Sequence, residues 1–174
     1  MKKALLLILI SLLISCTFSS KEENEPREKT AYPDLVLENA EYLLGQSNER
    51  PIVVRGERIT FYSKDNRAEL ERFSFSQEDE EGNIILQGSA DEGLINTKSK
   101  TMDLKGNVFL EKPGEGMEIH AENLFFDSES EEAKADGKVV VKSKDGEFSG
   151  TDFYGDLRNM VYSFSEMEDG KIKI

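Results

Sequence analysis

Side chains able to do chemistry are scarce in this sequence of 174 residues, which contains one Cys, Cys16, and one His, His120. A single Cys cannot close an internal disulfide, and nothing is spaced like a zinc site. In the segment "EIHAE", His120 falls on the polar face of an alternating pattern, as expected of a solvent-facing side chain. Acidic pairs such as Glu80–Glu81 and Glu131–Glu132 lie in expected loops without an apolar pocket, so we interpret them as solvated turn charges. The sequence therefore predicts no catalytic residue, no metal site and no cofactor.

Cys16 is the side chain whose surroundings do indicate a reaction. Two Lys residues precede an apolar run from Ala4 to Ile14, which is far shorter than the roughly 20 residues of a membrane-spanning helix. The stretch "LISC" that ends at Cys16 resembles the bacterial lipobox. The resemblance implies diacylglyceryl transfer to the thiol and cleavage before Cys16, so that acyl chains hold the protein on a membrane. The alternative is an ordinary signal peptide followed by a chance Cys.

The residues after Cys16, "TFSSKEENEPREKTA", are charged and nearly free of apolar side chains. Such a composition cannot bury enough surface to fold, which favours a flexible tether. We therefore expect a signal peptide at 1–15, a lipidated Cys and tether at 16–32, and a folded domain at 33–174. This length suits one domain with its own core.

The net charge of −13 argues against nucleic-acid binding, which needs clustered Lys and Arg. The segment "KPGEGME" lacks the Lys and Ser/Thr of a phosphate-binding loop, so no nucleotide site is expected. The segment "QEDEEGN" does not have the spacing of a calcium loop.

Apolar residues alternate along most of the predicted domain, which is typical of strands with one buried face. In "TMDLKGNVFLEK" the apolar face consists of Met102, Leu104, Val108 and Leu110, with Phe109 as an exception. In "GMEIHAENLFF" the alternation shifts phase after Ala121, which predicts a bulge or bend. After the signal segment, no window shows a convincing helical stripe, so the sequence predicts a nearly all-β fold.

The strand pattern is also repeated. A shift of 31 residues aligns seven positions without a gap, namely Leu86 with Met117, Ala90 with Ala121, Ile95 with Phe126, Asn96 with Asp127, Gly106 with Gly137, Val108 with Val139, and Leu110 with Val141. A shift of 29 residues extends the pattern to Phe148, Gly150, Phe153 and Asp156. In each unit a strand ends in Asn or Asp, which starts a turn, and the next strand crosses a Gly. A period near 30 residues in an all-β chain indicates stacked hairpins, as in a solenoid, an elongated jelly roll or an open barrel.

The unit "I-x-A-x-x-L-x-[FY]-D … G-x-V-x-[LV]" resembles the OstA-type repeat of lipopolysaccharide transport proteins, and the whole layout is most similar to the LptC family. The resemblance covers 34–174 and is strongest between Ile84 and Asp156. It implies an elongated, twisted, boat-shaped β-jelly roll of stacked antiparallel strands. One departure concerns the membrane anchor. Members of that family often keep a transmembrane helix, whereas in this chain lipid on Cys16 is expected to take its place.

The resemblance also implies a lipid-binding groove inside the jelly roll. The side chains that we expect to line it are Met102, Leu104, Leu110, Met117, Ile119, Leu124, Phe126, Val139, Val141, Phe148 and Phe153. The alternative, from the residues alone, is that they fill an ordinary dry core. Both readings place them on one apolar face.

The function that the resemblance implies is that of a non-enzymatic lipid conduit, lipid-anchored at the periplasmic face of the inner membrane. It would accept lipopolysaccharide or a similar lipid from an ABC transporter and pass it to an OstA-repeat bridge protein by edge-strand pairing. Two alternatives stay open: a surface or periplasmic structural lipoprotein, and a lipid carrier with a different cargo. An open apolar groove would favour the conduit, and a closed, filled core would favour a surface module.

Overall fold

The computed structural model describes residues 32–45 and 50–172, and within them the chain forms nine β-strands and one short 3₁₀ turn, Ser63–Asp65. The strands are β1 (Leu35–Leu44), β2 (Ile52–Tyr62), β3 (Arg67–Glu78), β4 (Ile84–Asn96), β5 (Thr101–Lys112), β6 (Met117–Asp127), β7 (Glu132–Ser143), β8 (Gly146–Asp156) and β9 (Val161–Ile172). The prediction of an all-β fold is confirmed.

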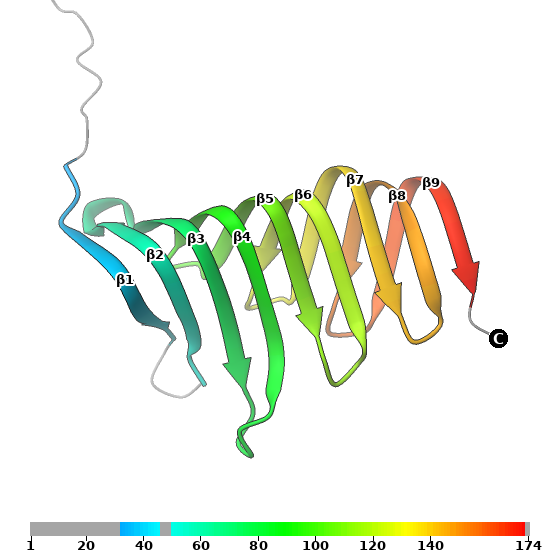
Figure 1. Cartoon of the computed structure of the whole chain (residues 1–174), viewed down its shortest axis with the longest axis horizontal. Helices are drawn as coiled ribbons and strands as arrows, with labels where there is room; N and C mark the ends of the chain where they lie inside the picture. The colour runs from blue at the N-terminus through cyan, green and yellow to red at the C-terminus, as the bar shows by residue number, and fades with distance from the viewer. Residues whose placement is uncertain (1–31, 46–49, 173–174) are drawn as a thin grey trace, which may run out of the picture. The chain divides into compact units, whose positions relative to one another are not determined.

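All nine strands belong to one antiparallel sheet whose spatial order, β1 to β9, is the order of the sequence. Because every connection is a hairpin, the sheet grows by one strand at a time along its long axis (Figure 1). The compact unit that begins at Tyr32 is thus an elongated, twisted β-jelly roll, as the family resemblance implies. Its two edges are β1 and β9.

Every strand folds over near its middle, along a line that we call the bend. Strand pairing slips or skips residues there, as between Lys105 and Val108 in β5 and between Ala135 and Lys138 in β7. Several residues at the bend have positive φ, among them Arg72 at 41° and Gly137 at 78°. An extra or left-handed residue shifts the side-chain alternation by one position, so that both halves of a strand turn their apolar side chains inward.

The residues at the bend are polar and exposed, as expected for the outer corner of a folded sheet. They include Asn39, Glu57, Arg72, Asp91, Asn107, Glu122, Asp136 and Asp152. The phase shift predicted in β6 after Ala121 is confirmed, because Met117 and Ile119 are buried before the bend and Leu124 and Phe126 after it.

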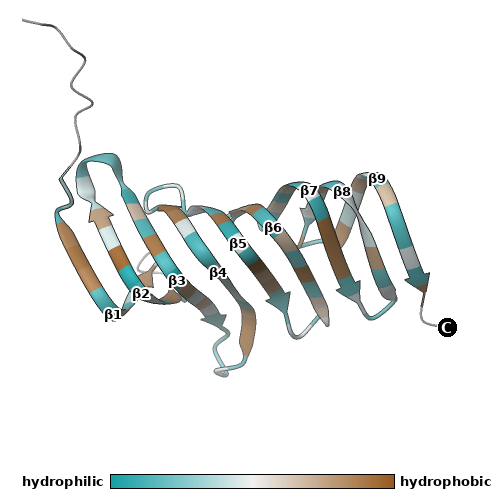
Figure 2. Ribbon diagram, turned by 45° about the horizontal axis from the view of Figure 1, so that its top comes forward, coloured by the Kyte–Doolittle hydropathy of each residue, from teal (hydrophilic) through white to brown (hydrophobic). Residues whose placement is uncertain are grey.

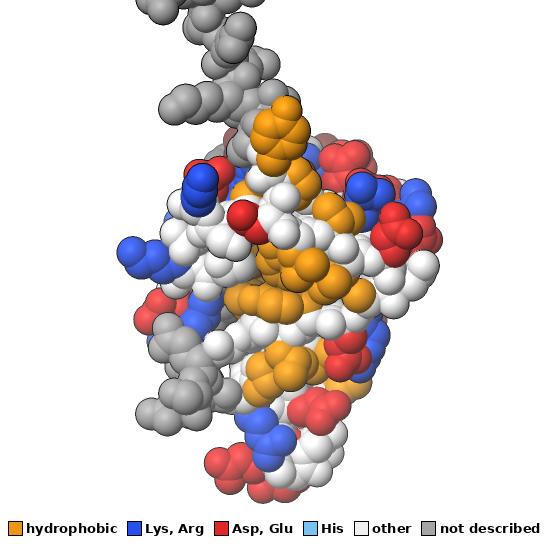
Figure 3. Space-filling view, turned by 90° about the vertical axis from the view of Figure 1, so that its left-hand side faces the viewer, with side chains coloured by type: hydrophobic (Ala, Val, Ile, Leu, Met, Phe, Trp, Pro, Cys, Tyr) orange, Lys and Arg blue, Asp and Glu red, His pale blue; other side chains and the backbone are white. Residues whose placement is uncertain are grey.

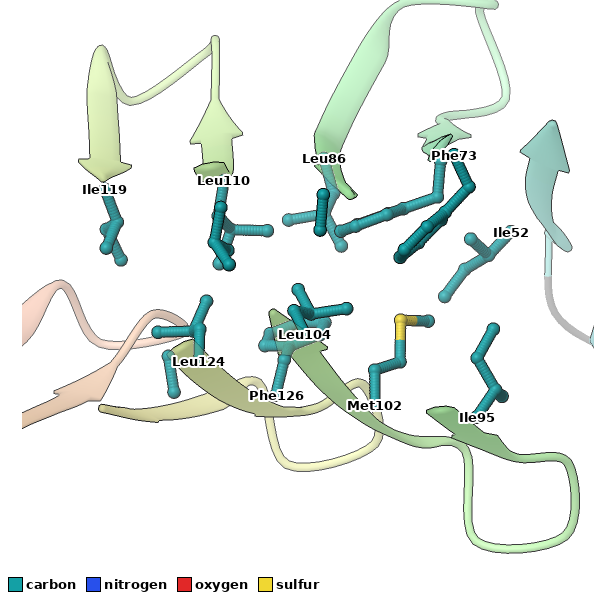
Figure 4. Packing of buried hydrophobic residues seen from close by; sticks show 14 of the residues in the cluster. Ile52, Phe73, Leu86, Ile95, Met102, Leu104, Leu110, Ile119, Leu124 and Phe126 are labelled. Carbon is teal, nitrogen blue, oxygen red and sulfur yellow. The ribbon is translucent and has the colours of Figure 1, made fainter. Parts of the chain in front are cut away.

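The bend divides the sheet into two walls that face each other across one hydrophobic core. Figure 4 shows Ile119 and Leu110 pointing from one wall toward Leu124 and Leu104 on the other. Since Ile119 and Leu124 both belong to β6, and Leu110 and Leu104 to β5, each strand packs against itself across the interior. The alternation of hydrophobic and hydrophilic residues along the strands is visible in Figure 2.

The hairpin turns form two rims along the free ends of the walls. The first rim carries the turns at 79–83, 113–116 and 144–145, and the second rim carries those at 63–66, 97–100, 128–131 and 157–160. Along the second rim, three turns begin in the same way, at Asn96, Asp127 and Asp156. In each turn the side-chain Oδ1 accepts hydrogen bonds from the backbone N–H groups two and three residues ahead, at 2.9–3.2 Å. These matching turns confirm the repeat.

Candidate functional site

The interior consists of rows of side chains set by strand register. On the first wall Leu110 pairs with Ile119, Ile119 with Val141, and Val141 with Phe148. On the second wall Ile95 pairs with Met102, and Met102 with Phe126. Neighbouring strands lie about 4.8 Å apart, so each row is a continuous apolar stripe along the molecule.

Ten of the eleven predicted groove residues are buried in this interior, with 0–2% of their surface exposed, namely Met102, Leu104, Leu110, Met117, Ile119, Leu124, Phe126, Val139, Val141 and Phe153. Phe148 is half-buried, because it lies near the open end of the sheet beside Tyr162 of β9. The ten side chains belong to one hydrophobic cluster between the walls and are closed to solvent.

The interior is exposed at both ends. At the β1 end the large exposed apolar side chains are Tyr32, Leu35, Val36 and Leu43, and Figure 3 shows hydrophobic side chains gathered there between charged ones. Tyr42 and Phe61 stack edge to face at 4.8 Å just inside. At the β9 end Tyr162 and Phe164 are partly buried against Phe153, while Met167 and Ile172 are exposed.

The rims face each other along the open side of the jelly roll. A crevice of about 460 Å³ lies between them, lined on the first rim by Arg50 and Glu80 and on the second by Ser128 and Glu129, and it reaches the core residue Leu86. Lys112 also lines this crevice and crosses it. Its Nζ donates to Oε2 of Glu131 at 2.7 Å and to the carbonyl oxygen of Leu157 at 2.9 Å, both on the second rim.

Glu131 lies in a turn, as expected of the Glu131–Glu132 pair, and its side chain is 34% exposed. In addition it pairs with Lys112 and, at 3.6 Å, with Arg158. No local feature of the sequence predicts this contact, since Lys112 and Glu131 come from opposite rims. Glu132 instead pairs with Lys134 and accepts from the hydroxyl of Tyr154.

The outer face carries the remaining candidates. His120 is half-exposed there, with its ring 5.2 Å from that of Phe109 and its Nε2 3.4 Å from Glu118. In "QEDEEGN" the carboxylate of Asp79 accepts from the backbone N–H groups of Glu81 and Asn83, and these bonds close the turn. Over residues 32–45 and 50–172, no three His, Cys, Asp or Glu side chains are grouped as metal ligands.

Cys16 and the predicted tether as far as residue 31 lie outside the described residues. Within the part of the chain that is described, no helix has the length and hydropathy needed to cross a bilayer.

An antiparallel sheet folded over an apolar interior, with exposed apolar ends and two edge strands, defines an open-ended β-jelly-roll protein. The family model for lipopolysaccharide-assembly, LptC-related proteins matches residues 4–167, and the chain therefore belongs to the LptC family. No match was found among curated proteins.

Membership of this family gives the protein a role in lipopolysaccharide transport. The family consists of transport and bridging proteins that interact with lipopolysaccharide and with the other transport components. It is associated with the inner membrane and places its β-domain in the periplasm.

Proposed function

We propose that this protein is a membrane-tethered lipid conduit. It accepts lipopolysaccharide or a closely similar lipid from an ABC transporter in the inner membrane and passes it to the next β-jelly-roll bridge protein. The observation that carries the proposal is the family match, which runs from residue 4 through the tether to β9. It therefore covers the N-terminal segment as well as the folded domain.

The anchor in this proposal is lipid on Cys16. Cleavage before Cys16 would remove residues 1–15, and 16–32 would then link the acylated Cys to the domain at 33–174. Several acyl chains on one residue suffice for stable anchoring, since each buried CH₂ contributes about 0.8 kcal/mol.

The edge strands support end-to-end assembly. β1 and β9 lie at the two ends of the sheet, so each can add a strand from a neighbouring jelly roll through backbone hydrogen bonds. The inward-facing apolar side chains exposed at these ends, Leu35 on β1 and Met167 and Ile172 on β9, would then be covered by the partner's interior. Such pairing would join two interiors into one path.

In this proposal the energy for lipid transfer comes from the ABC transporter. The chain has a net charge of −13, so long-range electrostatics do not attract an anionic lipid to it. Apolar burial would hold the acyl chains, while the ABC transporter supplies the work of loading.

The packed interior is the observation that favours the alternative, a structural lipoprotein whose β-domain binds a protein partner. A filled core, with residues such as Met102 and Phe126 at 0% exposure, needs no cargo to be stable. The two functions differ in whether the walls ever admit lipid.

Site-specific photocrosslinking distinguishes them. A benzoylphenylalanine at Phe126, in the interior, should crosslink to lipopolysaccharide in membranes where the transporter hydrolyses ATP. The same probe at His120, on the outer face, is the matched control and should give little adduct. Equal labelling at both positions, or none at Phe126 while transport runs, contradicts the conduit and favours the structural lipoprotein.

The anchor has its own test. Cys16→Ser should leave the β-domain folded but unprocessed or mislocated, because the short apolar run cannot anchor stably by itself. The measurement is phase partitioning in detergent together with the mass of the mature N-terminus. A wild-type mature protein that partitions wholly into water argues against lipidation.

A further inference from the structure

Lys112 joins the two rims of the jelly roll. It is the last residue of β5, on the first rim, and its Nζ contacts Glu131 and the carbonyl oxygen of Leu157, which lie on two successive turns of the second rim. The side chain of Lys112 is 18% exposed. We call these contacts the Lys112 bridge.

Several other polar contacts of the described turns run along one rim. On the first rim, Lys144 donates to the carbonyl oxygen of Gly114 at 3.1 Å, and Gln77 donates to that of Arg50 at 3.0 Å. On the second rim, the backbone N–H of Leu157 donates to the carbonyl oxygen of Glu131 at 2.9 Å. Contacts of this kind stiffen a rim, whereas the Lys112 bridge closes the gap between rims.

The second-rim side of the bridge is held in place independently. Arg158 contacts Oε1 of Glu131 at 3.6 Å and donates to the carbonyl oxygen of Glu129 at 2.6 Å. Leu157, whose carbonyl accepts from Lys112, is itself buried with 1% exposure. Losing the bridge therefore removes this contact between the rims without dismantling the turns of the second.

We propose that the Lys112 bridge is a latch that controls whether the two walls separate. Lys112 and Glu131 are then positioning residues for cargo entry: acyl chains reach the interior only while the bridge is open. The identity of the cargo in this inference rests on the proposed function, but the latch itself does not.

The geometry suits a hinge with a latch. The bend, opposite the rims, has interrupted pairing and residues with positive φ, so it can change its angle at a lower cost than a regular ladder. Separating the rims around that hinge exposes the core between them. The crevice beside Lys112 already reaches Leu86 and is where such an opening would begin.

The chemistry of the bridge allows it to open reversibly. Both charges keep part of their hydration, at 18% and 34% exposure, so water can replace their contact when it breaks. A fully buried ion pair would lose far more on opening. Breaking this partly exposed pair and one further hydrogen bond should raise the open population about tenfold, which corresponds to about 1.4 kcal/mol.

The latch is tested first without cargo. A cysteine at Met102, which has 0% exposure, can react with a maleimide only when the interior opens. The full chain is labelled in membranes depleted of lipopolysaccharide, and mass spectrometry of the peptide containing residue 102 separates this site from Cys16. Lys112→Met should raise the labelling rate about tenfold, while Lys112→Arg should stay close to the parent.

Lys144→Met is the matched control, because it removes the same charge from the first rim and a contact that does not cross the gap. Urea denaturation of each variant reports global stability. If Lys112→Met also lowers the urea midpoint, Glu131→Gln is the variant that tests the latch. It keeps the shape of the side chain and should still raise the labelling rate severalfold. Unchanged labelling in both variants, or an equal rise in Lys144→Met, overturns the latch.

Cargo is added in the second step, with benzoylphenylalanine at Phe126 and an active transporter. Lys112→Met should increase the lipid adduct that forms before ATP is added. If the parent and Lys112→Met form equal amounts of adduct before ATP is added, the result contradicts the latch and supports the conduit. If no variant forms an adduct, although the cysteine at residue 102 becomes reactive in Lys112→Met, the result contradicts the conduit and supports the latch.

Discussion

Strands β6 and β9 have similar apolar alternation but very different burial. In β6, Met117, Ile119, Leu124 and Phe126 are all at most 2% exposed. In β9, Tyr162 and Phe164 are only partly buried, Met167 is 64% exposed and Ile172 is 73% exposed. The difference teaches that alternation defines an inward face, while burial of that face requires a strand on each side and a facing wall.

The same rule applies at the other end of the sheet. β1 also shows apolar alternation, yet Leu35, which pairs with the core-packed Phe61, is 49% exposed because no strand of the described chain covers β1 on its outer edge. Middle strands therefore supply the stability of the domain, and end strands supply the surface that a neighbouring jelly roll would cover.

The largest expected effect tests the middle of the sheet against its end. Phe126→Ala removes a ring with 0% exposure and should lower the free energy of unfolding by about 3–5 kcal/mol. Phe164→Ala removes a partly buried ring from β9 and should cost about 1 kcal/mol, because less contact is lost. Urea denaturation of the two variants measures both. Similar losses would mean that β9 is as well packed as the middle strands.

Substitutions at the bend should have an intermediate effect on the free energy of unfolding. Gly106 and Gly137 occupy equivalent bend positions in β5 and β7, with φ of 72° and 78°. Changing either to Val should cost about 1–3 kcal/mol, since a β-branched side chain is strained at positive φ. Gly106 should be the more sensitive, because a Cβ there would lie 2.6 Å from Oδ2 of Asp91, whereas open space surrounds Gly137.

Gly114→Val is the control for the bend, because no atom lies within 4 Å of the added Cβ and the residue is in a turn on the first rim. It should change the urea midpoint little. A loss as large as that at Gly137 would show that Val is disfavoured at any Gly, and the bend would lose its special role.

The smallest effect concerns the second-rim turns. Burial opposes ionisation of Asp127, but the backbone N–H groups of Glu129 and Ser130 outweigh it and hold the pKa of its carboxyl below the ordinary 3.8. The side-chain and backbone N–H groups of Asn159 likewise lower the pKa of Asp156. A folded-state pKa below the unfolded value gives stability that is present above about pH 4 and is lost as pH falls through the folded value.

Asp127→Ala should therefore cost about 0.5–1 kcal/mol at pH 7 and less at pH 3. Asp127→Asn should be nearly neutral at pH 7, because Asn96 makes the same turn one repeat earlier. Urea midpoints at the two pH values measure this. If Asp127→Asn lowered the urea midpoint as much as Asp127→Ala, the negative charge and not the accepting oxygen would be what stabilises the turn.

The sequence alone predicted much of the fold. Alternation in "TMDLKGNVFLEK" and the phase shift after Ala121 predicted the strands and the bend, since a period of two has one physical meaning. The 31-residue repeat predicted the equivalence of Asn96 with Asp127 and of Gly106 with Gly137. These are local properties, determined by a few neighbouring residues.

Whether the interior is open or filled was decided by tertiary structure. Ile119 and Leu124 lie five residues apart and face each other only because β6 folds over, and the distance between the walls depends on how the side chains of many strands pack. Lys112 and Glu131 look like ordinary surface charges in sequence, because nothing local to either residue places it opposite the other. Pairing them requires the two rims to come together, and that position is set by the bend and the packed core, not by any short stretch of the chain.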